Sequence, residues 1–255
     1  MKFQIKNYQT GNVIFECDLS DESAALENKI QLGLAIKKAD AEGAILSGAD
    51  LSGAVLLGAD LPGVNFSGAY MPDVDLSGAY MPDADLSKAN LTGAKMLGAF
   101  LPRADFSGAN VRGADLSKAY MPEAGFSDAD LSGVNFSGAY MPEAGFSDAK
   151  MPDAYMSGAY MTGVYMSAVY MPGAVFSGAY MPEVNLSDAY MTGAKMLGAF
   201  MWGVNFSGAY MQGADLSKAY MLEANFSGTY MPEVDLSDAY MTGVDLSNVA
   251  KNSYR

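Results

Sequence analysis

The chain contains no histidine and a single cysteine, Cys17. Without histidine it lacks the side chain most often used as a general base and as a metal ligand. Serines are frequent, but a nucleophilic serine needs a positioned base. One cysteine excludes an internal disulfide. We therefore expect no catalytic, cofactor-binding or metal-binding residues, and a protein that is not an enzyme.

Long apolar runs are also missing. No stretch approaches the roughly 18 consecutive apolar residues that a membrane-spanning helix needs. Lys, Gln and Asn interrupt the apolar residues of the first fifteen positions, so the chain shows no signal-peptide core. We therefore expect a soluble, cytoplasmic protein that does not bind membranes.

Basic residues are scarce, with 15 Lys and Arg against 29 Asp and Glu, which gives a net charge of −14. Binding to nucleic acid depends on Lys and Arg, so the acidic balance argues against direct nucleic-acid binding. Pairs of acidic residues 20 positions apart, such as Asp85 and Asp105, supply too few oxygens for Ca²⁺, which takes about six or more. We interpret them as solvated surface.

What the chain does have is a five-residue register that runs from residue 44 to residue 248 without a slip. Every fifth residue from Leu46 to Leu246, which we call the centre of its unit, is Met, Leu, Phe or, once, Val111. The residue two places before each centre is Ala or Val, with Thr229 as the exception. Neither a helix, with a period of 3.6, nor a strand, with a period of 2, explains this spacing.

Proline and glycine have fixed places in this register. Each of the 10 prolines directly follows a centre, and glycine is the commonest residue one place further on. Proline followed by glycine is typical of the two middle positions of a type II turn. Each unit is therefore predicted to be a short extended piece followed by a turn. A chain that turns every five residues winds into coils, and stacked coils bury a continuous core.

The units Ala49-Asp50-Leu51-Ser52-Gly53 and Ala114-Asp115-Leu116-Ser117-Lys118 closely resemble those of the pentapeptide-repeat proteins. This resemblance implies an all-β solenoid, a right-handed quadrilateral β-helix of about ten coils with four pentapeptides each. It also implies that the centres and the small residues before them point inward. The many Met centres and the Tyr-Met-Pro units depart from the usual family pattern.

Residues 1–43 lie outside the register and are predicted to cap the rod. KFQIKNY and VIFECDL are predicted to be two strands joined by a hairpin turn at residues 9–12. A helix is expected from Asp21 to about Lys38, with Ser20 as its N-cap. We expect its apolar residues to cover the first coil; these are Leu26, Ile30, Leu34 and Ile36. The division is then 1–43 for the cap, 44–248 for the β-helix and 249–255 for a short C-terminal tail.

Four units per coil would place residues 20 apart above one another on one face of the rod. On one face, the residue before the centre is then aromatic in nine successive coils, with rungs about 4.8 Å apart. This predicted tyrosine ladder is our candidate interaction surface: Tyr80, Phe100, Tyr120, Tyr140, Tyr160, Tyr180, Phe200, Tyr220 and Tyr240. The alternatives are a ladder that only stabilises the rod and a ladder that carries charge along it.

The last coil is expected to be exposed, because only seven residues follow it. Two rods could meet there end to end and form a homodimer through Phe226, Met241 and Leu246. The alternative is a frayed last coil in a monomer.

The sequence thus predicts a non-enzymatic rigid rod that acts as a structural scaffold or protein-protein interaction module for an unknown protein partner. LTGAKMLGAF at 91–100 returns almost unchanged at 191–200, which indicates recent duplication or deliberate construction. The family resemblance also implies an alternative, an acidic DNA mimic that inhibits DNA gyrase. Against it, the rod would carry about half of the charge density of DNA, which has one charge per roughly 1.7 Å of axis.

Overall fold

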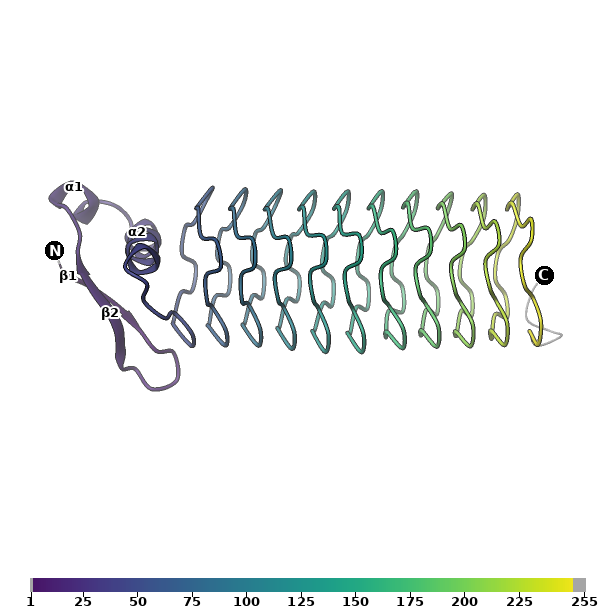
Figure 1. Ribbon diagram of the computed structural model, residues 1–255, viewed down its shortest axis with the longest axis horizontal. Coiled ribbons are helices and arrows are strands. Elements are labelled where there is room, and N and C mark those ends of the chain that lie inside the picture. The colour runs from purple at the N-terminus through teal and green to yellow at the C-terminus, as the bar shows by residue number, and fades with distance from the viewer. Residues whose placement is uncertain (1, 250–255) are drawn as a thin grey trace.

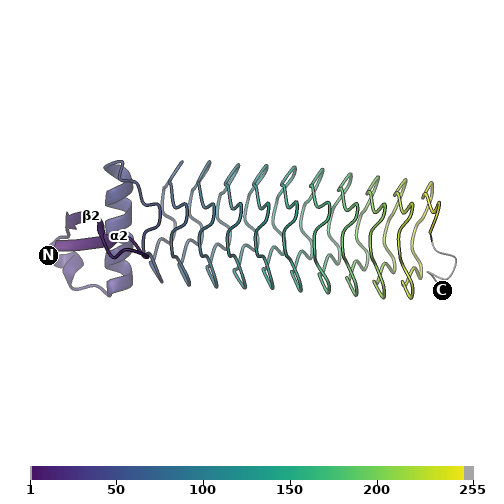
Figure 2. The same cartoon turned by 90° about the horizontal axis from the view of Figure 1, so that it is seen from below.

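The computed structural model describes residues 2–249 and shows a straight rod of stacked coils with a small cap at one end (Figure 1). The cap consists of a β-hairpin and two helices. The second helix lies across the end of the rod, beside the first coil (Figure 2). The far end of the rod carries no such covering element among the described residues.

Successive coils are joined by backbone hydrogen bonds between residues about 20 positions apart. Parallel bridges link the residues before the centres, from Asp50 with Tyr70 through to Asn225 with Asp245. Each centre donates its N–H to the next coil, as Leu51 does to the carbonyl oxygen of Tyr70 at 2.8 Å. The chain therefore forms the predicted right-handed quadrilateral β-helix.

The corner of each unit is a type II turn, as predicted. The N–H of the residue that follows the turn donates to the carbonyl oxygen of the centre, for example from Ala54 to Leu51 at 3.1 Å. The third turn residue has positive φ throughout, at Gly53 with 63° and also at Asp83 with 58°. Positive φ at this single turn position defines type II and explains the preference for glycine there.

The interior of the rod is apolar and closely packed. All centres from Leu46 to Met231 are buried, with at most 1% of their surface exposed. The rings of Phe106, Phe126 and Phe146 stack above one another at 4.7 and 4.8 Å between centroids. Thr229, the exception at the small position, is buried and donates its hydroxyl to the carbonyl oxygen of Phe206 at 2.9 Å. It therefore fits the core without an unsatisfied polar group.

The cap begins with an antiparallel hairpin of β1 (Lys2–Lys6) and β2 (Val13–Asp18). The turn between them is organised by the side chain of Asn7, whose Oδ1 accepts hydrogen bonds from the N–H groups of Gln9 and Thr10 at 3.0 and 2.9 Å. The hairpin then continues onto the rod, because the N–H of Tyr8 donates to the carbonyl oxygen of Gly48 at 2.9 Å.

The prediction of one helix from Asp21 to about Lys38 is wrong. The structure has a single turn, α1 (Asp21–Ala24), and then a longer helix, α2 (Asn28–Ala41). Ser20 does cap α1, since its Oγ accepts from the N–H of Ser23 at 3.2 Å. Glu27 has extended backbone angles, φ −60° and ψ 145°, so the chain changes direction there before α2 begins.

The predicted contact face of the helix is wrong at Leu26, whereas Leu34 packs against the hydrophobic core and Ile30 is half-buried. Leu26 lies in the break and is 42% exposed, whereas Ile36 is fully buried. The other buried residues of α2 are Gln31, Gly33, Ala35 and Ala39. Small side chains allow α2 to approach the first coil closely, and the N–H of Val55 donates to the carbonyl oxygen of Lys29 at 3.1 Å. Close approach of backbones therefore holds α2 on the rod, together with Ile36 and the partly buried Leu32 and Leu34, which pack in or against the core.

At the far end the core becomes progressively more exposed. Leu236 and Met241 are half-buried and Leu246 is 39% exposed. Phe226 does not belong to this end, because the next coil covers it and leaves it 0% exposed. Residues 250–255 of the predicted tail lie outside the described part of the chain. Within that part, no helix is long and apolar enough to cross a membrane.

Candidate interaction faces of the rod

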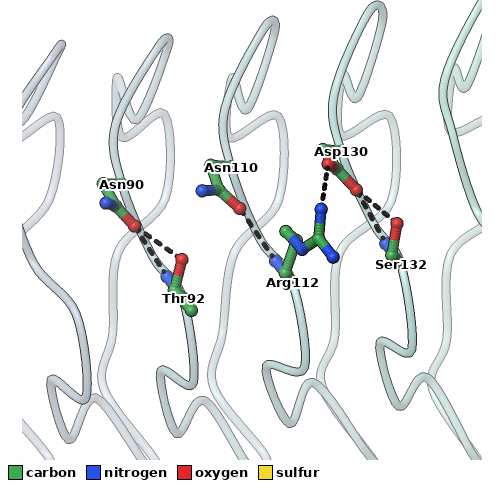
Figure 3. Close-up of polar contacts among 6 residues, drawn as sticks. All are labelled: Asn90, Thr92, Asn110, Arg112, Asp130 and Ser132. Carbon is green, nitrogen blue, oxygen red and sulfur yellow. Dashed lines mark hydrogen bonds and ion pairs between the residues drawn. The ribbon is translucent and has the colours of Figure 1, made fainter.

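The side chains on each face are selected by the chemistry of the turn that follows them. Every Asp or Asn before a centre, except Asp60, accepts a hydrogen bond from the N–H of the residue after that centre. Figure 3 shows three successive coils of one face, where Asn90, Asn110 and Asp130 make this contact. The side chain thus satisfies a donor that the turn leaves free.

Units with proline after the centre have no such donor, because proline lacks a backbone N–H. Among these units, only the one with Asp60 has an Asp or Asn before its centre. The others carry Tyr, Phe or Lys150 at that position. Proline thus removes the need for a polar acceptor in these units. Aromatic rings also occur without it, since Thr162, Trp202, Leu222 and Thr242 follow the centres after four rings of the predicted ladder.

The predicted ladder forms a continuous column of nine rings, from Tyr80 to Tyr240, which we call the long column. Its rings contact one another from coil to coil, with centroids 4.7 to 6.5 Å apart. From Tyr80 to Tyr140 and from Phe200 to Tyr240 the rings stack within 10° of parallel. Between these blocks they tilt by 38° to 45°. Rings stacked face to face leave their edges and the tyrosine hydroxyls towards solvent.

A second, shorter column lies on the opposite face and comprises Tyr170, Tyr190, Tyr210 and Tyr230. Its rings are 5.3 to 6.1 Å apart, and only the first pair is close to parallel. On the same face near the cap, Tyr8 of the hairpin stacks on Tyr70 at 4.4 Å. This contact joins segments far apart in the sequence, so no local pattern could have revealed it.

Trp202 follows the centre Met201, at a position that is at least partly exposed to solvent in most units. It is 43% exposed, but its ring meets those of Tyr180 and Phe200 edge-on, at 5.6 and 6.5 Å between centroids. It therefore widens the long column where the rings tilt.

The corner that follows the long column carries carboxylates at the third turn position, all of them exposed. We call this set the acidic corner: Asp83, Glu123, Glu143, Glu183 and Glu223. Arg103 lies in the same row and holds Asp83 through two hydrogen bonds of 2.7 Å, which lower the pKa of that carboxyl. The described residues show no ion pair to any of the four glutamates.

Elsewhere on the surface, some acidic side chains are already paired. The guanidinium of Arg112 donates to Oδ2 of Asp130 at 3.2 Å (Figure 3). Partial burial opposes ionisation of Asp130, but hydrogen bonds from Ser132 and the charge of Arg112 outweigh it and lower the pKa. In the described part of the chain, no group of three or more His, Cys, Asp or Glu could hold a metal ion. The surface hollows are shallow; one of them, about 410 Å³, is lined by glycines, Ala114, Asp115, Asn135, Ser137 and Tyr155.

The pentapeptide-repeat class is defined by a solenoid of square coils with type II turns at the corners. Its core consists of one large and one small apolar residue from each pentapeptide. The family model for pentapeptide repeats matches the chain in overlapping stretches from residue 37 to residue 248. The chain therefore belongs to the pentapeptide-repeat family. No curated protein sequence matches it.

Several solved structures resemble the chain. HetL, a pentapeptide repeat protein involved in heterocyst differentiation regulation from the cyanobacterium Nostoc sp. strain PCC 7120, is 22% identical, with 86% of this chain and 97% of HetL covered and a TM-score of 0.45. Full-length QnrB1, a plasmid-mediated fluoroquinolone resistance protein, is also 22% identical, with 75% and 90% covered and a TM-score of 0.35. A pentapeptide repeat protein of the thylakoid lumen of Arabidopsis thaliana is 33% identical over 43% of this chain and 66% of its own, with a TM-score of 0.15.

Proposed function

We propose that the chain is a non-catalytic, cytoplasmic interaction rod that binds a protein partner through the long column. The observation that carries this proposal is the exposure of the column. Seven of its nine rings have between 36% and 56% of their surface accessible. Aromatic residues are enriched in protein interfaces because they bury a large area with little loss of side-chain freedom.

The rigidity of the support strengthens this proposal. The residue before each centre donates its N–H to the preceding coil, as Tyr120 does to the carbonyl oxygen of Ala99 at 2.9 Å. The adjacent centre, Met121, is fully buried. The rings are therefore fixed to a backbone that loses little freedom when a partner docks, which favours binding.

A capture experiment with matched variants tests the proposal. The column variant is Tyr120→Ser/Tyr140→Ser. The control is Tyr155→Ser/Tyr165→Ser, because Tyr155 and Tyr165 are 50% and 57% exposed, and no ring contact to either is recorded among the described residues. We expect proteins retained from cell extract by the unaltered rod and the control to be lost with the column variant. Retention of the same proteins by all three rods would refute the proposal, provided that their thermal unfolding midpoints agree.

The exposed last coil supports a second contact, end to end between two copies. Leu236, Met241 and Leu246 are the exposed core residues there, and they replace the predicted set that included Phe226. Sedimentation of the rod over a range of concentrations tests this contact against Met241→Glu/Leu246→Glu. A monomer at every concentration would exclude the dimer.

Inhibition of gyrase by DNA mimicry is the alternative function. The net charge of −14 supports it, but the long column interrupts the acidic surface along one whole face. A supercoiling assay with purified gyrase decides between the two, because an interaction rod of the proposed kind leaves supercoiling unchanged.

A further inference from the structure

We infer that the long column and the acidic corner together bind a basic segment in the polyproline II conformation. This inference rests on the proposed function, because it names the partner class for the same face. Its first support is charge. The four glutamates of the acidic corner face solvent and form no ion pair within the described part of the chain; Arg103 attracts Glu123, but Glu143, Glu183 and Glu223 keep the surface beside the later rings negative. A cationic partner would relieve their mutual repulsion.

The second support is the spacing of the carboxylates. Glu143, Glu183 and Glu223 recur every second coil, with Gly163, Gly203 and Gly243 between them. The glutamate stem lies over the next glycine in each case. A Cβ built on Gly163 would be 3.7 Å from Cγ of Glu143, and one on Gly203 would be 3.8 Å from Cγ of Glu183. The glycines therefore leave room for the stems. From Glu143 onward one carboxylate stands on every second rung, whereas Glu123 and Glu143 stand on successive rungs.

The spacing of the glutamates along the rod matches the repeat of one backbone conformation of the partner and not of another. Two strand spacings are about 9.6 Å. A polyproline II helix has three residues per turn and rises about 9.3 Å per turn, so every third side chain would meet a carboxylate. An extended β-strand repeats its side chains every roughly 6.6 Å and loses register with the glutamates at once.

The third support is the apolar strip beside the carboxylates. Pro122 and Pro142 are half-buried. In the sequence, each of these prolines stands between a ring of the long column and a glutamate of the acidic corner. Proline-rich segments in the polyproline II form dock on surfaces lined by aromatic residues. Tyrosine hydroxyls are also suited to donate to the carbonyl groups of such a segment, which has no internal hydrogen bonds.

The short column provides an internal comparison. The third turn residues after its rings are Gly173, Gly193, Gly213 and Glu233, so this column has almost no carboxylates beside it. The short column therefore presents tyrosine rings without an acidic corner beside them. If basic peptides bind through charge and rings together, they will bind to the long column more tightly than to the short column.

Fluorescence anisotropy with a labelled peptide of four Pro-Pro-Lys repeats tests the inference. Comparison peptides are four Gly-Ser-Lys repeats, with equal charge but a flexible backbone, and four Pro-Pro-Glu repeats. We expect Pro-Pro-Lys to bind most tightly, Gly-Ser-Lys more weakly and Pro-Pro-Glu not at all. Equal binding of the two lysine peptides, or no binding of either, would overturn the inference.

Matched variants locate the site. Glu143→Gln/Glu183→Gln/Glu223→Gln should weaken binding about tenfold, as three exposed ion pairs would. The control removes three charges from another corner, by Asp128→Asn/Asp148→Asn/Asp188→Asn, and should change binding less than about twofold if long-range charge is screened. Equal losses in the two variants would show nonspecific attraction and overturn the inference.

Ring variants separate this inference from the proposed function. Tyr160→Ser/Tyr180→Ser should weaken Pro-Pro-Lys binding, whereas Tyr190→Ser/Tyr210→Ser should not. If the peptide does not bind although the column variant loses captured proteins, the proposed function stands and this partner class is wrong. If the peptide binds but no protein capture depends on the column, the proposed function fails instead.

Discussion

At the scale of single residues, the two kinds of unit are two solutions to one problem, the free N–H after each centre. In Asp-Leu-Ser units a carboxylate or amide accepts that hydrogen bond, as Asp215 does from Ser217 at 2.9 Å. In Tyr-Met-Pro units the donor does not exist. The sequence therefore alternates on the surface without any change in the backbone.

This account predicts a specific coupling between Asp215 and Ser217. Asp215→Ala should lower the free energy of unfolding by about 1 kcal/mol, because the N–H of residue 217 loses its acceptor. Adding Ser217→Pro removes the donor and should recover most of that loss. Ser217→Ala, the control, keeps both backbone N–H and acceptor and should cost less than Asp215→Ala. Chemical denaturation of the four proteins measures the coupling, and additive losses in the double variant would contradict it.

Backbone conformation at the third turn position gives a second prediction. Ala168 has φ of 56° there, and it has no polar side chain that could stabilise this left-handed conformation. Ala168→Gly should therefore raise stability by about 0.5–1 kcal/mol. Gly158→Ala is the reverse change at φ of 64°, with open space around a new Cβ, and should lower stability by a similar amount. Thermal unfolding that shifts in the same direction for both variants would contradict this explanation.

At the scale of elements, the repeats and the hairpin of the cap could be predicted from sequence, whereas the break between the helices and the docking of α2 could not. Within each pentapeptide, five residues determine the turn, the core side chain and the surface side chain. The coil and the long column could therefore be predicted directly from the five-residue register. The break at Glu27 and the position of α2 depend on the first coil, which lies outside the helix sequence. Tyr8 on Tyr70 and Trp202 on Tyr180 are likewise contacts between residues far apart in the sequence, which no local pattern predicts.

The docking of α2 predicts whether a Gly→Ala substitution in this helix raises or lowers the stability of the cap. In an isolated helix, Gly→Ala stabilises by about 1 kcal/mol. At Gly33, however, a Cβ would lie only 2.0 Å from the carbonyl oxygen of Val55, which is backbone and cannot move aside. Gly33→Ala should therefore destabilise the cap by about 1–3 kcal/mol.

Hydrogen exchange of the α2 amides measures this effect, and Gly145→Ala is the matched control. Gly145 has nothing within 4 Å of a new Cβ and no left-handed φ, so this change should leave exchange unaltered. Slower exchange of α2 in Gly33→Ala would mean that helix propensity outweighs the contact and that α2 does not pack closely on the coil.

At the scale of the whole molecule, the rod is not uniform along its length. Five consecutive centres are methionine in the middle coils: Met151, Met156, Met161, Met166 and Met171. The rings of the long column tilt over the same region, between Tyr140 and Phe200. Methionine has more rotamers than leucine and fills a core with less specific packing. The centre of the rod is therefore the place where core and surface order are both weakest.

Replacing methionine there should stiffen the rod. Met156→Leu/Met161→Leu/Met166→Leu conserves volume closely and removes side-chain entropy that folding must overcome, so we expect a gain of about 0.5 kcal/mol per site. The control makes the opposite change in a leucine-rich part of the core, with Leu76→Met/Leu86→Met/Leu91→Met, and should lower the thermal midpoint. Calorimetry measures both, and hydrogen exchange of residues 150–170 should slow in the first variant. A lower midpoint for the leucine variant would show instead that the thioethers fill shapes that leucine cannot, and that the middle of the rod is packed as specifically as its ends.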